Sequence, residues 1–354
     1  MSDELTIALD AMGGDAAPAI VVKGADFARR RFPNVRFHMF GDEARILPLM
    51  KRRKRLLQVT EITHTEDVVS NEEKASVALR KGRQSSMQLA INSVRDGAAS
   101  GVVSAGNTGA LMAMSKVTLR MLPGIDRPAI AAIFPTMRGE SVMLDLGANV
   151  ECDAENLVQF AIMGDVFART VLGTKDPSLA LLNVGSEEMK GHAEIQQASA
   201  YLRQMSNLLN FQGFVEGDDI AAGTADVVVC DGFTGNVALK TTEGTARLIK
   251  EFLGDAFRSS LASRLGFLLA RRGLRKMRNR IDPRRYNGAM FLGLTGIAVK
   301  SHGGTDAFGF ANAIGVAVDM AANGFNERIT EGLQSFGDFR PTAVIGNTAE
   351  AAAS

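Results

Sequence analysis

Short apolar runs alternate with longer stretches of helical periodicity along most of the chain. The first run, Leu5 to Leu9, is typical of a buried strand, and Pro18 opens a helical stretch that ends near Phe32, since proline is tolerated in the first turn of a helix. The pattern predicts further strands at 35–40, 57–62, 101–104, 129–134, 142–146, 179–184 and 226–229, and further helices at 45–54, 108–121 and 156–172. Strands that alternate with helices need crossover connections, so we expect an α/β fold whose largely parallel or mixed sheet carries helices on both faces.

The composition agrees with one large globular unit. The chain has 354 residues, 46% of them hydrophobic, which is enough to bury a substantial core. We expect residues 1–341 to form a single α/β catalytic unit and the small, polar stretch 342–354 to be a flexible tail. The acidic N-terminus does not resemble a signal peptide, and no apolar run approaches the ~20 residues that span a bilayer. We therefore expect a cytoplasmic protein.

Cysteine and histidine are too few and too scattered to suggest a metal centre. The two cysteines, Cys152 and Cys230, are interpreted as reduced thiols in a cytoplasm. The four histidines share no zinc-ligand spacing with them. We expect neither a metal nor a cofactor.

Polar residues and glycines gather where the predicted strands end. Five such turns read Asp10-Ala-Met-Gly-Gly-Asp15, Ser104-Ala-Gly-Asn-Thr-Gly109, Asp145-Leu-Gly-Ala-Asn149, Asn183-Val-Gly-Ser-Glu-Glu188 and Asp231-Gly-Phe-Thr-Gly-Asn236. Glycine lets the backbone approach a ligand, and a helix that begins after such a turn presents unpaired N–H groups. Any one turn is more commonly plain connection chemistry. Together, along one edge of a sheet, the five would form a cleft that binds an oxyanion.

The absence of several known motifs restricts the class of ligand and the class of reaction that we expect. There is no G-x-x-x-x-G-K-[ST] and no G-x-G-x-x-G after the first strand, so a phosphate-sized anion is favoured over a whole nucleotide. There is also no G-x-S-x-G nucleophile turn, and Cys230 is better explained as a buried structural thiol. Phosphate can itself be the nucleophile, and then no covalent enzyme intermediate is needed.

A further glycine-rich loop, Lys300-Ser-His-Gly-Gly-Thr-Asp306, follows the apolar run 294–299. A histidine between a lysine and an aspartate suits proton transfer or anion binding near neutral pH. The alternative is a loop histidine that only hydrogen-bonds the backbone.

A basic, amphipathic segment is the strongest electrostatic feature of the sequence. Apolar residues between Thr245 and Phe257 fall on one helical stripe, and a second apolar series runs from Leu261 to Ile281. Between Arg258 and Arg285 there are ten Lys or Arg residues and one acidic residue, Asp282, so this part carries +9 and the rest of the chain −8. Such a block is excessive for an ordinary solvated helix.

Three interpretations of this segment stay open. The helical pair could form an interface with a second subunit, its tip could lie on an anionic membrane, or its basic face could dock an acidic protein. Nucleic acid is not expected, because no recognition motif accompanies the charge.

Taken together and in order, the turns resemble those of the bacterial phosphate acyltransferases that make acyl phosphate for phospholipid synthesis. The resemblance covers about residues 5–318 and rests on Ile7-Ala-Leu-Asp-Ala-Met-Gly-Gly-Asp15, Ser104-Ala-Gly-Asn-Thr-Gly-Ala110, Leu144-Asp-Leu-Gly-Ala-Asn149, Leu182-Asn-Val-Gly-Ser-Glu-Glu188 with Lys190-Gly191, and Asp231-Gly-Phe-Thr-Gly-Asn-Val237 with Lys240. Four positions depart from the family pattern: Ala16 stands for a common His, Asn287 for a Gly, and Gly304-Thr305 for a Ser-Ser pair.

The resemblance implies transfer of a long acyl chain from acyl-[acyl-carrier-protein] to inorganic phosphate. It also implies a homodimer, a fold similar to the isocitrate and isopropylmalate dehydrogenases, and peripheral association with the inner face of the cell membrane near the downstream glycerol-3-phosphate acyltransferase. A protruding helical hairpin at about 242–285 would then serve dimerisation and membrane contact, the latter through Leu261, Leu265, Phe267 and Leu268.

These expectations lead to a set of candidate site residues. The candidates for catalysis are His302, Asn149, Asn236 and Asp231. The candidates for binding phosphate or substrate are Asp10, Gly13, Gly14, Asp15, Ser104, Asn107, Thr108, Lys190 and Lys240. Competing functions are a short-chain transacylase that uses a coenzyme A thioester, a dehydrogenase on the same fold, and a non-enzymatic membrane adaptor that binds carrier protein.

Overall fold

The computed structural model describes residues 5–337, so the predicted tail at 342–354 lies outside the described residues. The strands form one mixed sheet in the order β3-β2-β1-β4-β11-β10-β5-β6-β9-β7-β8. Their bounds are β1 Thr6–Asp10, β2 Arg36–Gly41, β3 Thr60–His64, β4 Gly101–Ser104, β5 Ala129–Pro135, β6 Glu140–Leu144, β7 Ser178–Leu182, β8 Asn210–Val215, β9 Val227–Val229, β10 Ala289–Leu292 and β11 Ile297–Lys300.

The strand directions divide the sheet into two halves. Strands β1, β2, β3, β4 and β11 run parallel to one another, and so do β6, β7, β8 and β9. Between the halves, β10 is antiparallel to both β11 and β5, and β5 is antiparallel to β6. The two halves therefore point in opposite directions, and their carboxyl ends lie at opposite edges of the sheet.

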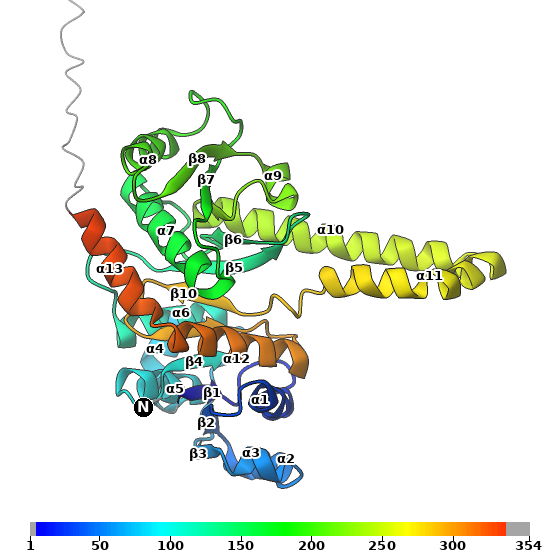
Figure 1. Cartoon of the computed structure of the whole chain (residues 1–354). Helices are drawn as coiled ribbons and strands as arrows, with labels where there is room; N and C mark the ends of the chain where they lie inside the picture. Colours follow the sequence, from blue (N-terminus) through cyan, green and yellow to red (C-terminus); the bar gives the residue numbers. More distant parts are fainter. Residues whose placement is uncertain (1–4, 338–354) are drawn as a thin grey trace, which may run out of the picture.

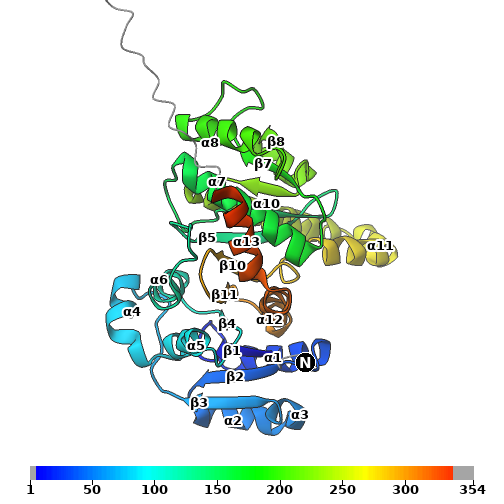
Figure 2. The ribbon, with the colours of Figure 1, turned by 60° about the vertical axis from the view of Figure 1, so that its left-hand side comes forward.

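Helices cover both faces, as the alternation of elements predicts. The helices of the main body are α1 Ala19–Arg31, α2 Glu43–Lys51, α3 Lys54–Leu57, α4 Ala75–Lys81, α5 Ser86–Arg95, α6 Thr108–Leu119, α7 Ala154–Phe167, α8 Ala193–Gln204, α9 Gly217–Ala222, α12 Ala307–Ala322 and α13 Phe325–Gly337. In Figure 2, α4, α5 and α6 lie on one side of β1 and β4, and α1 and α12 lie on the other. Neighbouring residues of β1 follow this division: Ile7 packs in the cluster with α1 and α12, and Ala8 in the cluster with α5 and α6.

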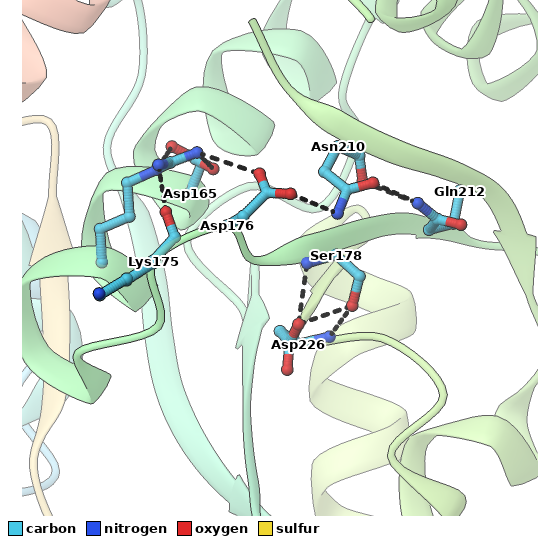
Figure 3. A network of polar contacts seen from close by, with 8 residues as sticks. Asp165, Lys175, Asp176, Ser178, Asn210, Gln212 and Asp226 are labelled. Carbon is cyan, nitrogen blue, oxygen red and sulfur yellow. Dashed lines mark hydrogen bonds and ion pairs between the residues drawn. The ribbon is translucent and has the colours of Figure 1, made fainter.

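A hydrogen-bond network fastens the outer edge of the second half (Figure 3). Ser178, at the start of β7, donates from its N–H and its Oγ to Oδ2 of Asp226, at 2.8 and 2.7 Å, just before β9 begins. Asn210 of β8 donates to Asp176 over 3.1 Å. Arg169 pairs with Asp165 at 2.7 Å. These bonds align the starts of β7, β8 and β9, and the polar turns at Asn183 and Asp231 follow the far ends of β7 and β9.

Two long helices protrude from the body as a hairpin (Figure 1). Helix α10 spans Gly232–Arg258 and α11 spans Leu261–Arg280, so the longer arm extends about 40 Å at 1.5 Å per residue. No residue of α11 is buried, and at the tip the rings of Phe257 and Phe267 meet edge to face at 5.3 Å between centroids. None of the helices in residues 5–337 combines the length and the hydrophobicity that a membrane span requires.

Some element boundaries differ from those predicted from the sequence. The strand expected at 57–62 begins at Thr60, because residues 54–57 form the short helix α3. The helix expected from Thr245 is the outer part of α10, which begins at Gly232 inside a predicted turn. Strands β8 and β10 were not predicted.

Candidate functional site

Three glycine-containing turns meet at the carboxyl edge of β1, β4 and β11. A Cβ on Gly13 would lie 2.4 Å from Oδ2 of Asp10 and 2.7 Å from the backbone N of Gly106. Gly14 has φ +103°, which favours glycine, and its Cβ position lies 2.9 Å from Cβ of Ala105. The N–H of Asp15 donates to the carbonyl of Gly303 over 3.1 Å. The turns are thus packed backbone against backbone, and we call them the cradle: residues 10–15, 104–109 and 300–306.

Asp10 lies at the centre of the cradle without reaching its surface. The Oγ atoms of Ser86 and Ser104 each donate to a different oxygen of the carboxyl group over 2.6 Å, and the N–H of Met12 donates over 3.3 Å. Burial raises the pKa of Asp10, although these hydrogen bonds oppose the shift. Ser104 also accepts from the N–H of Gly106 over 3.0 Å. Asp10 and Ser104 therefore fix the shape of the turns.

Lys300 is the cationic group of the cradle, and sequence reasoning gave it no role. It ends β11 opposite Ser104 of β4. Its Nζ donates to the carbonyl of Ala105 over 3.4 Å and also to the carbonyl of Ser301. Burial lowers the pKa of Lys300 to about 8, and the charges of Asp10 and Asp15 oppose that shift. The available signal was a lysine directly after a buried apolar run, next to a glycine-rich loop.

His302 lies on the exposed rim of the cradle. Its Nδ1 accepts from the N–H of Gly304 over 3.1 Å, so in the neutral ring the proton is on Nε2. Its backbone N–H donates to Oδ1 of Asn287 over 2.9 Å. Asn287 also donates to Ser301 Oγ and to the carbonyl of Gly309, each over 2.8 Å. The departure from the family pattern at Asn287 thus supplies a buried support for the histidine loop.

Asn107 and Thr108 begin helix α6 at the mouth of the cradle. Oδ1 of Asn107 accepts from the N–H of Ala110 over 3.0 Å, a helix cap. Its Nδ2 donates to the carbonyls of Asn71 and Glu73 over 3.0 and 2.8 Å. The side chain is therefore fully engaged in holding the neighbouring loop. Thr108 is exposed, and the first turn of α6 contains no acidic residue that would compete with an anion.

A second group of predicted residues gathers around the ends of β6 and β9. Oδ1 of Asp145 accepts from the N–H of Ile130 over 2.9 Å. Nδ2 of Asn149 donates to the carbonyl of Pro128 over 2.7 Å and to Oδ2 of Asp145 over 2.9 Å. Asp231 caps α10 by accepting from the N–H and the hydroxyl of Thr234, each over 2.8 Å. The polar atoms of this group are largely used to join the two turns.

The expectation that all five turns share one edge is wrong. Ser104 pairs with Lys300 at the carboxyl ends of β4 and β11, whereas Asp145 bonds Ile130 near the amino end of β5, which runs antiparallel to β6. The antiparallel pairings of β5 and β10 reverse the chain direction between the halves. Asn149, Asn236 and Asp231 therefore lie at the edge opposite the cradle.

The remaining predicted lysines also belong to the second half. Lys190 is exposed, and its carbonyl accepts from Nδ2 of Asn183 over 3.0 Å. Lys240, two turns into α10, pairs with Glu243 at 2.9 Å. Neither lies in the three turns of the cradle.

Neither cysteine is suited to act as a nucleophile. Burial raises the pKa of Cys152 to about 12 and holds that of Cys230 well above its ordinary value. Across residues 5–337, no group of three or more His, Cys, Asp and Glu side chains is arranged to hold a metal ion.

Sequence comparison places the chain among well-described relatives. A family model described as "Fatty acid synthesis protein" matches residues 5–328. The phosphate acyltransferase of Rhodospirillum centenum is 64% identical over 333 residues, which cover 94% of either chain. That of Paramagnetospirillum magneticum is 61% identical over 329 residues, 93% of this chain and 94% of the relative.

Comparison of structures confirms the predicted fold class. The EutD phosphotransacetylase from Staphylococcus aureus superposes with a TM-score of 0.60 at 18% identity, over 90% of this chain and 94% of that one. A phosphotransacetylase from Streptococcus pyogenes gives 0.63 at 16% identity, over 91% and 95%. At such identities the likeness concerns the fold alone.

Proposed function

Because the chain belongs to the family of phosphate acyltransferases, we propose that it moves a long-chain acyl group from acyl-[acyl-carrier-protein] to inorganic phosphate. The products are acyl phosphate and free carrier protein, and the acyl phosphate serves phospholipid synthesis by way of phosphatidic acid. Transfer of an acyl group to phosphate follows from the family. The donor and the use of the product are the proposal.

The observation that carries the proposal is the cradle. Its backbone turns at Gly13 and Gly14, the exposed start of α6 at Thr108 and the ammonium group of Lys300 belong to one edge of the sheet. Amide N–H groups and a partly buried cation together form a site for a small dianion. Burial at Lys300 strengthens its attraction for phosphate, because the charge is poorly screened by water.

The reaction needs one new bond and one broken bond. A phosphate oxygen attacks the carbonyl carbon of the thioester, the tetrahedral intermediate collapses, and the carrier's thiolate leaves and takes up a proton. A thiolate is a good leaving group, so holding phosphate against the carbonyl supplies most of the rate enhancement. The N–H groups at the start of α6 would stabilise the developing oxyanion. His302 would donate a hydrogen bond from Nε2 at the rim.

Asn149, Asn236 and Asp231 lie at the edge of the sheet opposite the cradle. The side-chain amide of Asn149 donates to the carboxylate of Asp145, and the carboxylate of Asp231 caps α10. We propose that these residues position the start of α10 and take no part in the chemical step within their own chain. Lys190 and Lys240 are likewise left out of phosphate binding.

The hairpin is proposed to serve dimerisation and peripheral contact with an anionic membrane. Large apolar side chains along it stand exposed in the single chain: Leu248 51%, Phe252 64%, Leu261 83%, Leu265 60%, Phe267 42% and Leu268 62%. Exposed apolar surface of this extent is typical of interaction sites, and the basic residues of α11 would meet anionic lipids. Contact with the inner face of the cell membrane would bring acyl phosphate close to a glycerol-3-phosphate acyltransferase.

One incubation tests the proposed reaction. Purified protein is mixed with palmitoyl carrier protein and phosphate, and acyl phosphate is trapped as its hydroxamate. Product from the carrier thioester, little from palmitoyl coenzyme A, and none when sulfate replaces phosphate would agree with the proposal. Binding of carrier protein without formation of acyl phosphate would refute the proposal that the protein is an acyltransferase. A preference for the coenzyme A thioester would refute the proposed donor.

A further inference from the structure

A pocket of about 440 Å³ lies where the returning arm of the hairpin joins the body. It is formed by the end of α1, the start of α12, the end of α11 with the segment that follows it, and the start of β6. The residues that define its chemistry are Arg31, Arg280, Arg285, Tyr286, Phe308 and Glu140. None of them belongs to the cradle.

Three guanidinium groups from two distant parts of the sequence line this pocket, with Glu140 as the one carboxylate among its lining residues. Arg280 is held in place by donating to the carbonyls of Thr136 and Met137, at 3.2 and 2.6 Å. Arg31 lies 5.0 Å from the ring centroid of Phe32. Asp282 faces Arg285 and Asp319 faces Arg31 from outside the lining, so the excess of positive charge is confined to the lining itself, where three guanidinium groups meet one carboxylate. The pocket is therefore electropositive and suited to carboxylates.

The pocket is connected to the cradle through Arg284. This side chain donates to Asp282 at 2.6 Å and to Asp306 at 2.7 Å. Asp306 ends the loop of His302 and caps α12, and Phe308, two residues on, lines the pocket. In Figure 1 the chain returning from α11 passes close to the start of α12. The pocket and the cradle thus flank the same helix start.

We propose that this pocket docks an acidic face of the protein that carries the acyl thioester. The inference rests on the proposed donor and adds the surface that recognises it. Carboxylates on a partner helix would pair with Arg31 and Arg285, and the exposed Phe308 would pack against an apolar residue between them. The block of +9 between Arg258 and Arg285 would draw an acidic partner toward this base. Docking here leaves the thioester on the cradle side of α12.

Charge changes of opposite sign give a sharp test. We would titrate fluorescently labelled carrier protein without an acyl group and measure Kd by anisotropy, in the absence of lipid. Arg285→Glu should weaken binding roughly tenfold, as loss of a close charge pair does. Glu140→Gln should tighten it, which a folding defect would not do. Arg55→Glu, at an exposed arginine of α3 that does not line the pocket, is the matched control and should leave Kd unchanged.

Activity separates docking from chemistry. With acyl carrier protein as donor, Arg285→Glu should raise KM and leave kcat nearly unchanged, and the dependence of kcat/KM on salt should become shallower. With an uncharged acyl-pantetheine donor, the variant should match the parent protein. An unchanged Kd in Arg285→Glu, or an equal loss with both donors, would overturn the inference. Failure of the parent protein to make acyl phosphate from any donor would refute the proposed function instead.

Discussion

The hydroxyl of Ser104 donates a 2.6 Å hydrogen bond to Oδ2 of Asp10, and this bond joins the ends of two strands that are 94 residues apart in the sequence. Both residues are buried. Asp10 and Ser104 therefore contribute to the proposed phosphate site through the shape of the turns and not through contact with an anion. The carboxyl group of Asp10 holds two glycine turns together.

Removal of that hydroxyl should loosen the cradle. In Ser104→Ala, one oxygen of Asp10 and the N–H of Gly106 each lose a partner. We expect a loss of about 1–3 kcal/mol in the free energy of unfolding and a higher KM for phosphate. Urea denaturation and initial rates measure the two effects. Stability and phosphate KM that both equal those of the parent protein would contradict this role.

Lys300 should make phosphate binding sensitive to alkaline pH. Its lowered pKa of about 8 means that the free protein loses this charge above pH 8. We expect kcat/KM for phosphate to fall as pH rises through 8, while phosphate itself stays dianionic. Lys300→Met should abolish this alkaline fall in kcat/KM and raise KM for phosphate. Lys300→Arg should move the fall beyond pH 10.

The same group predicts an opposite trend in stability. The pKa of Lys300 is about 8 in the folded state and near its ordinary value of 10.5 when unfolded, so between these values the unfolded chain binds more protons. Stability contributed by this group therefore rises with pH across that window. Thermal unfolding of the parent protein and of Lys300→Met should differ in slope there. Parallel profiles would show that the amine is not buried as described.

The close packing of the turns predicts a strong effect at Gly13 and none at a matched glycine. A methyl group at Gly13 would press on Asp10 and on the backbone of Gly106. Gly13→Ala should cost about 2 kcal/mol or more and impair activity. A methyl group at Gly244 in α10 meets nothing within 4 Å. Gly244→Ala should be neutral or slightly stabilising, as alanine favours a helix.

Asn149 offers a direct test of the two-edge arrangement. Its amide bonds Pro128 and Asp145, far along the sheet from the cradle. Asn149→Ala should lower stability by about 1–3 kcal/mol while KM for phosphate stays within twofold. A large rise in that KM without loss of stability would place Asn149 in the phosphate site after all.

The hairpin tip should govern binding to membranes. Leu265 and Leu268 are 60% and 62% exposed. The double variant Leu265→Glu and Leu268→Glu should release the protein from anionic vesicles in a flotation assay and leave activity in solution intact. Leu57→Glu, at an exposed leucine on α3, is the control. Vesicle binding that persists in the double variant would exclude this tip as the anchor.

Sequence reasoning located the glycine-containing turns at the strand ends because their signals are local. The glycines at 13 and 14, the start of a helix at Thr108 and the period of the apolar runs each follow from a few adjacent residues, whereas the start of α10 at Gly232 was missed. Fold class followed from the alternation of strands and helices. Lys300 was visible in the sequence, but its burial depends on packing contributed by β4 and by the turn after β1.

The position of the turns at one edge of the sheet or the other could not be predicted from such local signals. Whether Ser104 and Asp145 share an edge depends on which way β5 and β10 run, and β10 is a four-residue strand between Gly288 and Gly293 with too few positions to show a period. Strand order and direction are set by contacts between residues far apart in the sequence. Only the pairing itself reveals that the chain reverses between the halves.

Helix α10 makes the hairpin mechanically continuous with the sheet. Its first turn is wedged against β6, where a Cβ on Gly235 would lie 1.9 Å from the carbonyl oxygen of Asp145, and it then runs unbroken to Arg258. If the hairpin tilts as a rigid body, it does so about the start of α10, directly after β9. A tilt of about 10° would carry the tip roughly 7 Å for an arm of about 40 Å. Whatever holds the tip therefore also constrains the orientation of the body, and with it the direction in which the cradle faces.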